Sequence, residues 1–164
     1  MVSFEKYIRI AILLFWLTAT AGLSAVDVVG ALLKDTVATF SDSYDLIYYS
    51  VKSALVRDLK AQKSTMQETA SVTNERIESY LESRGISVRR DRQPIQRKEF
   101  ARLLMQRFDL PLSAFTRLFG TSGWYYRDAV RSGLFSEDER GDETMSTREM
   151  LSVFSRAEEL SRSK

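Results

Sequence analysis

The sequence Ile-Gln-Arg-Lys-Glu-Phe-Ala at residues 95–101 begins the stretch that decides the fold. After this start, large apolar residues recur at intervals of three or four positions, at Phe100, Leu103, Leu104 and Phe108. The spacing places them on one face of a helix, because residues three and four apart in an α-helix lie one above the other. The stretch therefore predicts an amphipathic helix with a buried apolar face.

A second segment, Met-Ser-Thr-Arg-Glu-Met-Leu at residues 145–151, resembles this helix start, with Glu149 in the position of Glu99, 50 residues later. A period of this length lies within the range of repeat modules. Ser146 and Glu149 also have the Ser-x-x-Glu spacing of a capping box, which explains the segment by local helix chemistry alone. The two segments are therefore consistent with an internal repeat or with two independently capped helices.

The rest of the chain after residue 25 has helical rather than strand periodicity. Apolar residues recur on one helical face at 28–59, as one helix or as two helices with a break at 41–43. A further helix is predicted at 73–84, where Gly85 ends it, and the arginine-rich residues 86–94 have no apolar period. The sequence therefore predicts an all-α protein that consists of an N-terminal helical region at 26–84, a linker at 85–94 and a helical module at 95–164.

Composition and charge narrow the chemistry of the chain. It contains no cysteine and no histidine, so it has no disulfide, no thiol nucleophile and none of the usual general bases near neutral pH. A net charge of +2 does not indicate nucleic-acid binding. A basic run at 84–102 is interpreted as a solvated surface or as a site for an anionic partner, and the acidic run at 137–143 lacks the residue order of a calcium loop. The sequence predicts no metal site, no cofactor and no catalytic residue.

The N-terminus has the pattern of a secretory signal. Lys6 and Arg9 precede an apolar run at 10–17, and small residues then lead to a predicted cleavage site at the end of a signal peptide over 1–25. The alternative is a membrane anchor over 8–33 that is not removed. Either interpretation predicts an exported protein of the bacterial periplasm or cell envelope, which contacts the membrane only through this segment if the segment is retained.

Between the two helix starts, Trp-Tyr-Tyr-Arg-Asp-Ala-Val at 124–130 is followed by Gly133 and Leu134. Together these motifs make residues 95–160 resemble the S-layer homology family. Its helical repeats carry an Ile-Thr-Arg-x-Glu-Phe/Met-Ala helix start and a Trp-led helix that ends in Ala-Gly-Ile/Leu. Residues 145–157 resemble the start of a following repeat, whereas the Phe-x-Asp-Val element that precedes the Trp in the family is missing. The resemblance implies a helical binding module.

The resemblance also implies candidate binding residues. Family members hold an anionic wall polysaccharide with the help of the motif arginine and tryptophan. Arg97 and Lys98 would accordingly pair with an acidic sugar group, Trp124 or Tyr125 would stack on a sugar face, and Arg148 is the basic residue of the second helix start. These five residues are the predicted ligand or partner site.

Two of these residues also have a structural interpretation. Trp124 would then be the core anchor of a small helical module, and Arg97 would bridge to Glu99 or to a neighbouring helix end.

The expected function is that of a non-catalytic cell-envelope protein whose module attaches to an anionic cell-wall glycan or to another envelope protein. The alternative is a periplasmic scaffold or assembly subunit that acts through helix–helix contacts of the 28–59 face and forms an oligomer.

Overall fold

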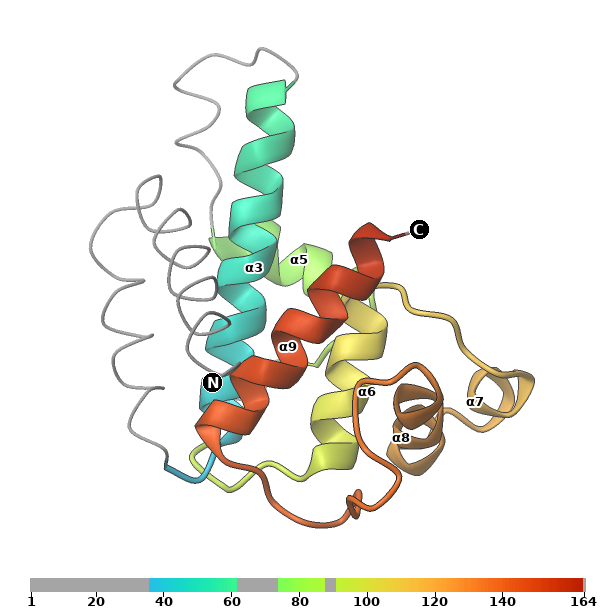
Figure 1. Cartoon of the computed structure of the whole chain (residues 1–164). Coiled ribbons are helices and arrows are strands. Elements are labelled where there is room, and N and C mark those ends of the chain that lie inside the picture. The colour runs from blue at the N-terminus through green and yellow to red at the C-terminus, as the bar shows by residue number, and fades with distance from the viewer. Residues whose placement is uncertain (1–35, 62–73, 88–90, 164) are drawn as a thin grey trace, which may run out of the picture.

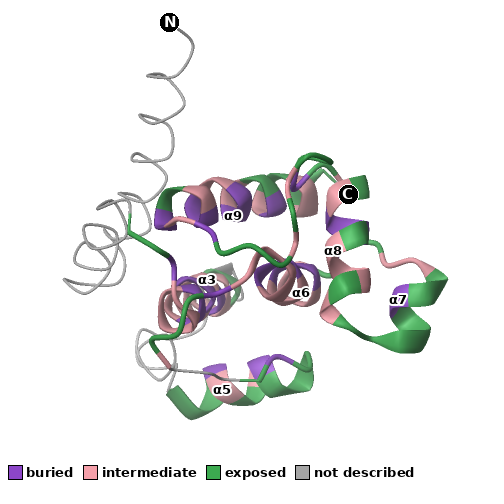
Figure 2. Cartoon of the chain, turned by 90° about the horizontal axis from the view of Figure 1, so that it is seen from below, coloured by how far each residue is buried: buried purple, intermediate pink, exposed green. Residues whose placement is uncertain are grey.

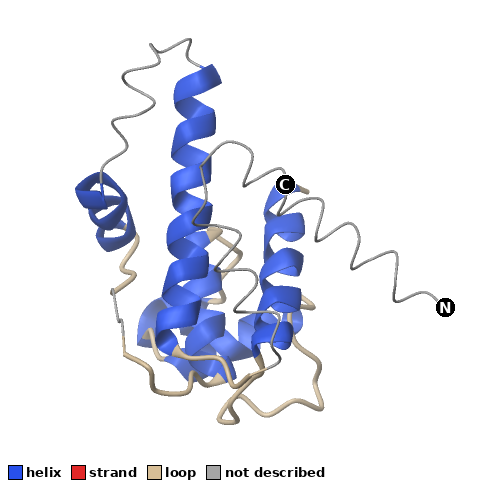
Figure 3. Cartoon of the chain, turned by 90° about the vertical axis from the view of Figure 1, so that its left-hand side faces the viewer, coloured by secondary structure: helices blue, strands red, loops and turns tan. Residues whose placement is uncertain are grey.

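The computed structural model describes residues 36–61, 74–87 and 91–163, and these residues confirm the prediction of an all-α protein (Figure 1). The described helices are α3 (Phe40–Ala61), α5 (Asn74–Ser83), α6 (Arg97–Arg107), α7 (Ala114–Phe119), α8 (Ser122–Arg131) and α9 (Thr147–Arg162). Within these ranges the connections are loops, with no strand (Figure 3). The predicted signal peptide at 1–25 lies outside the described residues, and no helix within them is long and apolar enough to cross a membrane.

The helices pack around α6. Figure 2 shows α6 between α3 and α8, with α9 on one side of this layer and α5 on the other. The strongest helix–helix packing is between α6 and α8, while α7 lies at the outer edge and packs on α8. The module at 95–164 is therefore built on α6, the helix that starts in the 95–101 stretch.

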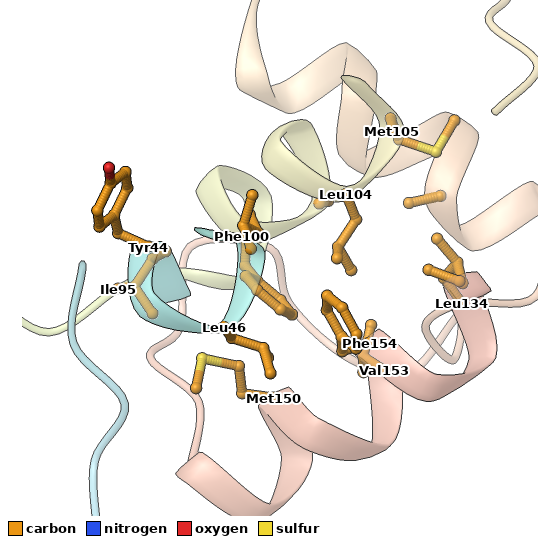
Figure 4. Close-up of a cluster of buried hydrophobic side chains, with 14 of the residues drawn as sticks. Tyr44, Leu46, Ile95, Phe100, Leu104, Met105, Leu134, Met150, Val153 and Phe154 are labelled. Carbon is orange, nitrogen blue, oxygen red and sulfur yellow. The ribbon is translucent and has the colours of Figure 1, made fainter. Parts of the chain in front are cut away.

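One hydrophobic cluster joins the described helices, with α7 as the exception. Phe100 and Leu104 of α6 are fully buried and lie between side chains of α3 and α9 (Figure 4). The cluster also includes residues of α5 and α8, whereas α7 contributes no buried apolar side chain. Its labelled members in Figure 4 are Tyr44, Leu46, Ile95, Phe100, Leu104, Met105, Leu134, Met150, Val153 and Phe154.

Short segments before three of the helices form a closed ring of backbone contacts. The segments are 37–39 before α3, 94–96 before α6 and 144–146 before α9, and each forms an isolated antiparallel bridge with each of the other two. We call this arrangement the helix-start ring, and it lies at the lower end of the molecule in Figure 1. The bridged pairs are Val37 with Ser146, Thr39 with Pro94, and Gln96 with Thr144.

The helix-start ring has an approximate three-fold repetition. The first residue of each helix donates its N–H to the carbonyl just before the neighbouring segment, from Phe40 to Gln93 (3.1 Å), from Arg97 to Glu143 (3.0 Å) and from Thr147 to Thr36 (2.8 Å). The middle residue of each segment is buried, as the side chains of Ala38, Ile95 and Met145 are. The sequence indicates this helix start twice, and the structure contains it three times.

Three helices end in the same way. The residue after the cap has a positive φ, and the next residue is buried and donates its N–H back to the last turn, as in a Schellman motif. The positive-φ residues are Gly85 (71°), Asp109 (51°) and Gly133 (75°), and the buried residues that follow them are Ile86, Leu110 and Leu134. The predicted stop at Gly85 is confirmed. The helix that starts at 97 ends at Arg107, because Asp109 already reverses the chain before Pro111 is reached.

The described parts of the predicted N-terminal region and of the predicted module share a core. Ile86, inside the predicted linker at 85–94, is buried, and the carbonyl groups of Asp91 and Gln93 accept hydrogen bonds from the first turn of α3. The described residues of this range are mostly exposed, but Ile86 and these two carbonyl groups join the range to the helices. Whether 26–84 and 95–164 fold as separate units stays a prediction.

Candidate functional site

Arg97 is the first residue of α6, next to the helix-start ring, and its guanidinium contacts two carboxylates. Its guanidinium donates to both carboxylate oxygens of Glu149, with Nε–Oε1 at 2.6 Å and Nη2–Oε2 at 3.2 Å. A third bond joins Nη1 to Oε2 of Glu143 at 2.9 Å, and the Arg97 side chain is only 13% exposed. Arg97 thus connects the start of α6 to the start of α9, which is the bridge to a neighbouring helix end that the sequence offered as an alternative. Glu99 is not its partner.

The charge around Arg97 is already balanced within the protein. The hydrogen bond to Glu149, followed by the charge of Glu149 and the bond to Glu143, raises the pKa of the Arg97 guanidinium above its ordinary value despite its partial burial. Glu149 and Glu143 already accept the hydrogen bonds of all three guanidinium nitrogens, so an acidic sugar group would have to displace a carboxylate to pair with Arg97. The geometry at Arg97 therefore does not favour an anionic glycan.

The other basic candidates, Lys98 and Arg148, lie in the first turns of α6 and α9. Lys98 is the second residue of α6, its N–H donates to Gly141 O at 2.9 Å, and its ammonium forms no ion pair with any described residue. Arg148 is exposed in the first turn of α9. Lys98 is thus the chain neighbour of Arg97, and Arg148 is the chain neighbour of Glu149.

Trp124 and Tyr125 point to different surroundings although they are neighbours in the chain. Tyr125 packs against the hydrophobic cluster, while Trp124 is half-buried and lies outside the cluster. The interpretation of Trp124 as the core anchor is therefore wrong. Side chains of α7, and not the core, cover its ring.

Half-buried Trp124 of α8 lies beside a group of exposed apolar side chains on α7. Its ring stacks with Phe115 (centroids 5.1 Å apart, planes at 13°) and lies 6.2 Å from Phe119. Phe115, Leu118 and Phe119 are 56%, 75% and 55% exposed, which is unusual for large apolar side chains. We call Phe115, Leu118, Phe119 and Trp124 the aromatic surface.

A buried carboxylate holds α7 in this position. Asp128 of α8 accepts hydrogen bonds from the N–H of Ser113 (2.8 Å) and from the hydroxyl of Thr116 (2.6 Å), and the Ser113 hydroxyl in turn caps α7. Burial by itself raises the pKa of the Asp128 carboxyl, but the bonds from Thr116 and Ser113 and the charge of Arg131 outweigh burial, so the pKa lies below its ordinary value. Asp128 is therefore an anion that ties α7 to α8.

Basic side chains accompany the aromatic surface. The Arg127 guanidinium lies 4.5 Å from the centre of the Trp124 ring, in the geometry of a cation–π contact. Arg117 of α7 and Arg131 of α8 are exposed as well. The region thus combines the aromatic surface with three arginines. We call Arg117, Arg127 and Arg131 the basic border.

Sequence reasoning missed the three residues of α7 in this surface. The segment 114–119 is a helix capped by Ser113, and the spacing of Phe115, Leu118 and Phe119 resembles that of a core-facing stripe. The length of the helix could have indicated that these residues are exposed, because a helix of 6 residues with three large apolar side chains has little room to bury them all. Of the predicted site residues, only Trp124 is in this surface.

The described residues contain no cluster of acidic side chains that could hold a metal ion. Comparison of the chain with family models, with curated proteins and with solved structures finds no match.

Proposed function

We propose that this chain is a non-catalytic protein of the bacterial cell envelope, exported by its N-terminal segment, which attaches to the envelope through the module at 95–164. The aromatic surface is the observation that carries the proposal. Single exposed apolar residues are common, but several gathered on one element mark an interaction site. Their burial against a partner contributes about 25 cal/mol for each Å² removed from water.

The helix-start ring adds support for the S-layer homology resemblance behind this proposal. The family is built from repeats, and the start of α3 supplies a third copy of the pattern found at α6 and α9. A third helix start makes the described residues more similar to a repeat protein than the sequence motifs alone suggest.

Chemistry also favours attachment over catalysis. The chain has neither histidine nor cysteine, and the buried carboxylate of Asp128 is occupied by hydrogen bonds from Ser113 and Thr116. A general acid or base needs a carboxyl group that a substrate reaches. Asp128 serves instead to position α7.

Two earlier expectations about the contact are weakened by the geometry. An anionic glycan at Arg97 would meet the carboxylates of Glu143 and Glu149. A scaffold that acts through the 28–59 face would need Ile47 and Val51, which are buried in the protein's own core. The aromatic surface is free of both objections, so we place the envelope contact there.

The test is binding of the purified full-length chain to isolated cell envelopes. We expect the double variant Leu118→Ser/Phe119→Ser to bind at least about tenfold more weakly than the natural chain, because two exposed apolar contacts are lost. Val37→Ser is the matched control, since Val37 is 54% exposed and lies outside the aromatic surface. All three proteins carry the same N-terminal segment, so its contribution is constant. Equal binding by the double variant and the control would contradict the proposal.

A further inference from the structure

We infer that the aromatic surface inserts into the anionic lipid surface of an envelope membrane, with α7 as the inserted element. This inference rests on the proposed function and names the envelope component that the surface contacts. Shape and ring packing favour lipid over a glycan, and the charge of the region complements an anionic lipid surface.

The shape of the region is that of a projection. α7 lies at the outer edge of the molecule, beside α8 and away from α3 and α5 (Figures 1 and 2). Its large apolar side chains are exposed, and Leu118 is the most exposed of them at 75%. A convex apolar projection suits insertion between lipid headgroups, whereas small-molecule and sugar sites are usually concave.

The packing of the rings argues against a sugar. Phe115, Phe119 and Trp124 lie nearly parallel to one another, with interplanar angles of 6°, 13° and 20°. Rings that stack on one another cover part of the faces that a sugar would need. The Ser113 N–H and the Thr116 hydroxyl nearby are bonded to Asp128, so these two groups do not pair with the hydroxyls of a glycan.

The charge of the region complements lipid phosphate. Arg117, Arg127 and Arg131 are exposed on α7 and α8, and the only carboxylate of these two helices, Asp128, is buried. Arg131 reaches Asp128 at 3.3 Å but keeps 68% of its side chain exposed. Basic side chains beside inserted aromatic residues are typical of proteins that bind anionic membranes.

The acidic loop of the chain does not cancel this charge. Tyr126 donates its hydroxyl hydrogen to Glu139 O at 2.8 Å, so the acidic loop contacts α8 through Tyr126. Residues three or four apart share a helix face, which places Trp124, Arg127 and Arg131 together and Tyr126 on another face of α8. Arg127 and Arg131 therefore lie on a different side of α8 from the acidic loop.

Tryptophan fluorescence tests the inference directly. The chain has two tryptophans, Trp16 and Trp124, so the full-length variant Trp16→Phe reports on Trp124 alone. The probe is a vesicle of equal parts phosphatidylcholine and phosphatidylglycerol, in plain form and with bromine on the acyl chains. We expect a blue shift of Trp124 emission and its quenching by the brominated lipid, and weaker effects on vesicles of phosphatidylcholine alone. This readout is independent of membrane binding by the N-terminal segment, because that segment does not carry Trp124.

Matched variants separate the apolar from the electrostatic part. In the Trp16→Phe chain, Leu118→Ser/Phe119→Ser should abolish the quenching, and Arg117→Gln should lower the affinity for anionic vesicles about fivefold. Val37→Ser and Arg92→Gln are the controls, since both positions are exposed and lie outside α7 and α8. Circular dichroism and thermal unfolding check that each variant is folded.

Three outcomes would overturn the inference. Vesicle binding without quenching of Trp124 would assign the contact to the N-terminal segment. Equal quenching in the Leu118→Ser/Phe119→Ser chain would assign it to another surface. The third outcome is that the aromatic surface is needed for binding to isolated envelopes, whereas Trp124 is not quenched in vesicles. If protease treatment of those envelopes also abolishes binding, the partner is a protein. The proposed function then stands and the lipid inference falls.

Discussion

At the scale of single residues, the structure changes the role of the most prominent basic side chain. Arg97 is a ligand candidate by motif, yet its guanidinium is occupied by Glu143 and Glu149. Trp124 changes in the opposite direction, from a candidate for the core to a half-exposed ring beside Phe115. The type of a residue limits what it can bind, but only its neighbours decide whether its charge or ring face is free.

Replacement of Arg97 should affect stability more than binding. Arg97→Ala leaves the partly buried Glu149 without its bidentate partner, and we expect a loss of about 2–3 kcal/mol in the free energy of unfolding. Arg97→Lys keeps a charge but loses the paired geometry, so about 1 kcal/mol should be lost. Urea unfolding at neutral pH measures both values. Under conditions where both variants are folded, their envelope affinity should equal that of the natural chain; a specific loss of affinity in Arg97→Lys would restore the glycan interpretation.

At the scale of elements, local hydrogen bonds define where the helices begin and end. Thr39 and Asp42 form a reciprocal capping box at α3, and the Ser146 hydroxyl caps α9. α7 is different, because the 6-residue helix depends on Asp128 of α8 as well as on its own cap at Ser113. The position of the aromatic surface therefore depends on one carboxylate.

Asp128→Asn should loosen α7 and change the pH dependence of stability. The pKa of Asp128 lies below its ordinary value in the folded protein. The stability that this carboxylate contributes is therefore fully present above the pKa of an unfolded aspartate, about 3.9, and is lost as the pH falls through the lower folded pKa. We expect Asp128→Asn to cost about 1–2 kcal/mol at pH 7, and its unfolding free energy to fall less between about pH 4 and pH 2.

Urea unfolding at several pH values measures this difference. Asp138→Asn is the control, since Asp138 is exposed in the acidic loop. Identical pH profiles for the natural chain and for Asp128→Asn would show that the carboxylate does not stabilise the joint between α7 and α8.

At the scale of the whole molecule, the helix-start ring makes three distant segments interdependent. Residues 37–39, 94–96 and 144–146 bridge one another, and Ile95 fills the centre of one segment with no exposed surface. Hydrogen bonds connect Ile95 N–H to Ala38 O and Ala38 N–H to Met145 O, both at 2.9 Å. A destabilising change in one segment should therefore lower the stability of α3, α6 and α9 together.

Ile95→Ala tests this interdependence. Removing the buried side chain should cost about 3 kcal/mol in the free energy of unfolding, because a cavity remains where the side chain packed. Amide hydrogen exchange should accelerate to a similar extent in α3, α6 and α9, since they open as one unit. Val37→Ala, at an exposed position of the same ring, should change stability by less than about 0.5 kcal/mol. Acceleration confined to α6 and α9 would support separate folding of 26–84 and 95–164.

The sequence by itself determined the helical class and many of the helix boundaries. The helix start at 95–101, the cap at Ser146 and the stop at Gly85 follow from interactions between residues no more than a few positions apart. Apolar periodicity, side-chain caps and positive φ act over one helical turn, so they are visible in a linear sequence.

Only the tertiary structure decided which surface is available to a partner. The ion pair that neutralises Arg97 joins residues 52 positions apart, and the ring contact from Thr147 reaches back to Thr36. Likewise, the outward position of α7 depends on Asp128 in the next helix. Such contacts follow from the packing of whole helices around a common core, and no local pattern of residue types encodes them.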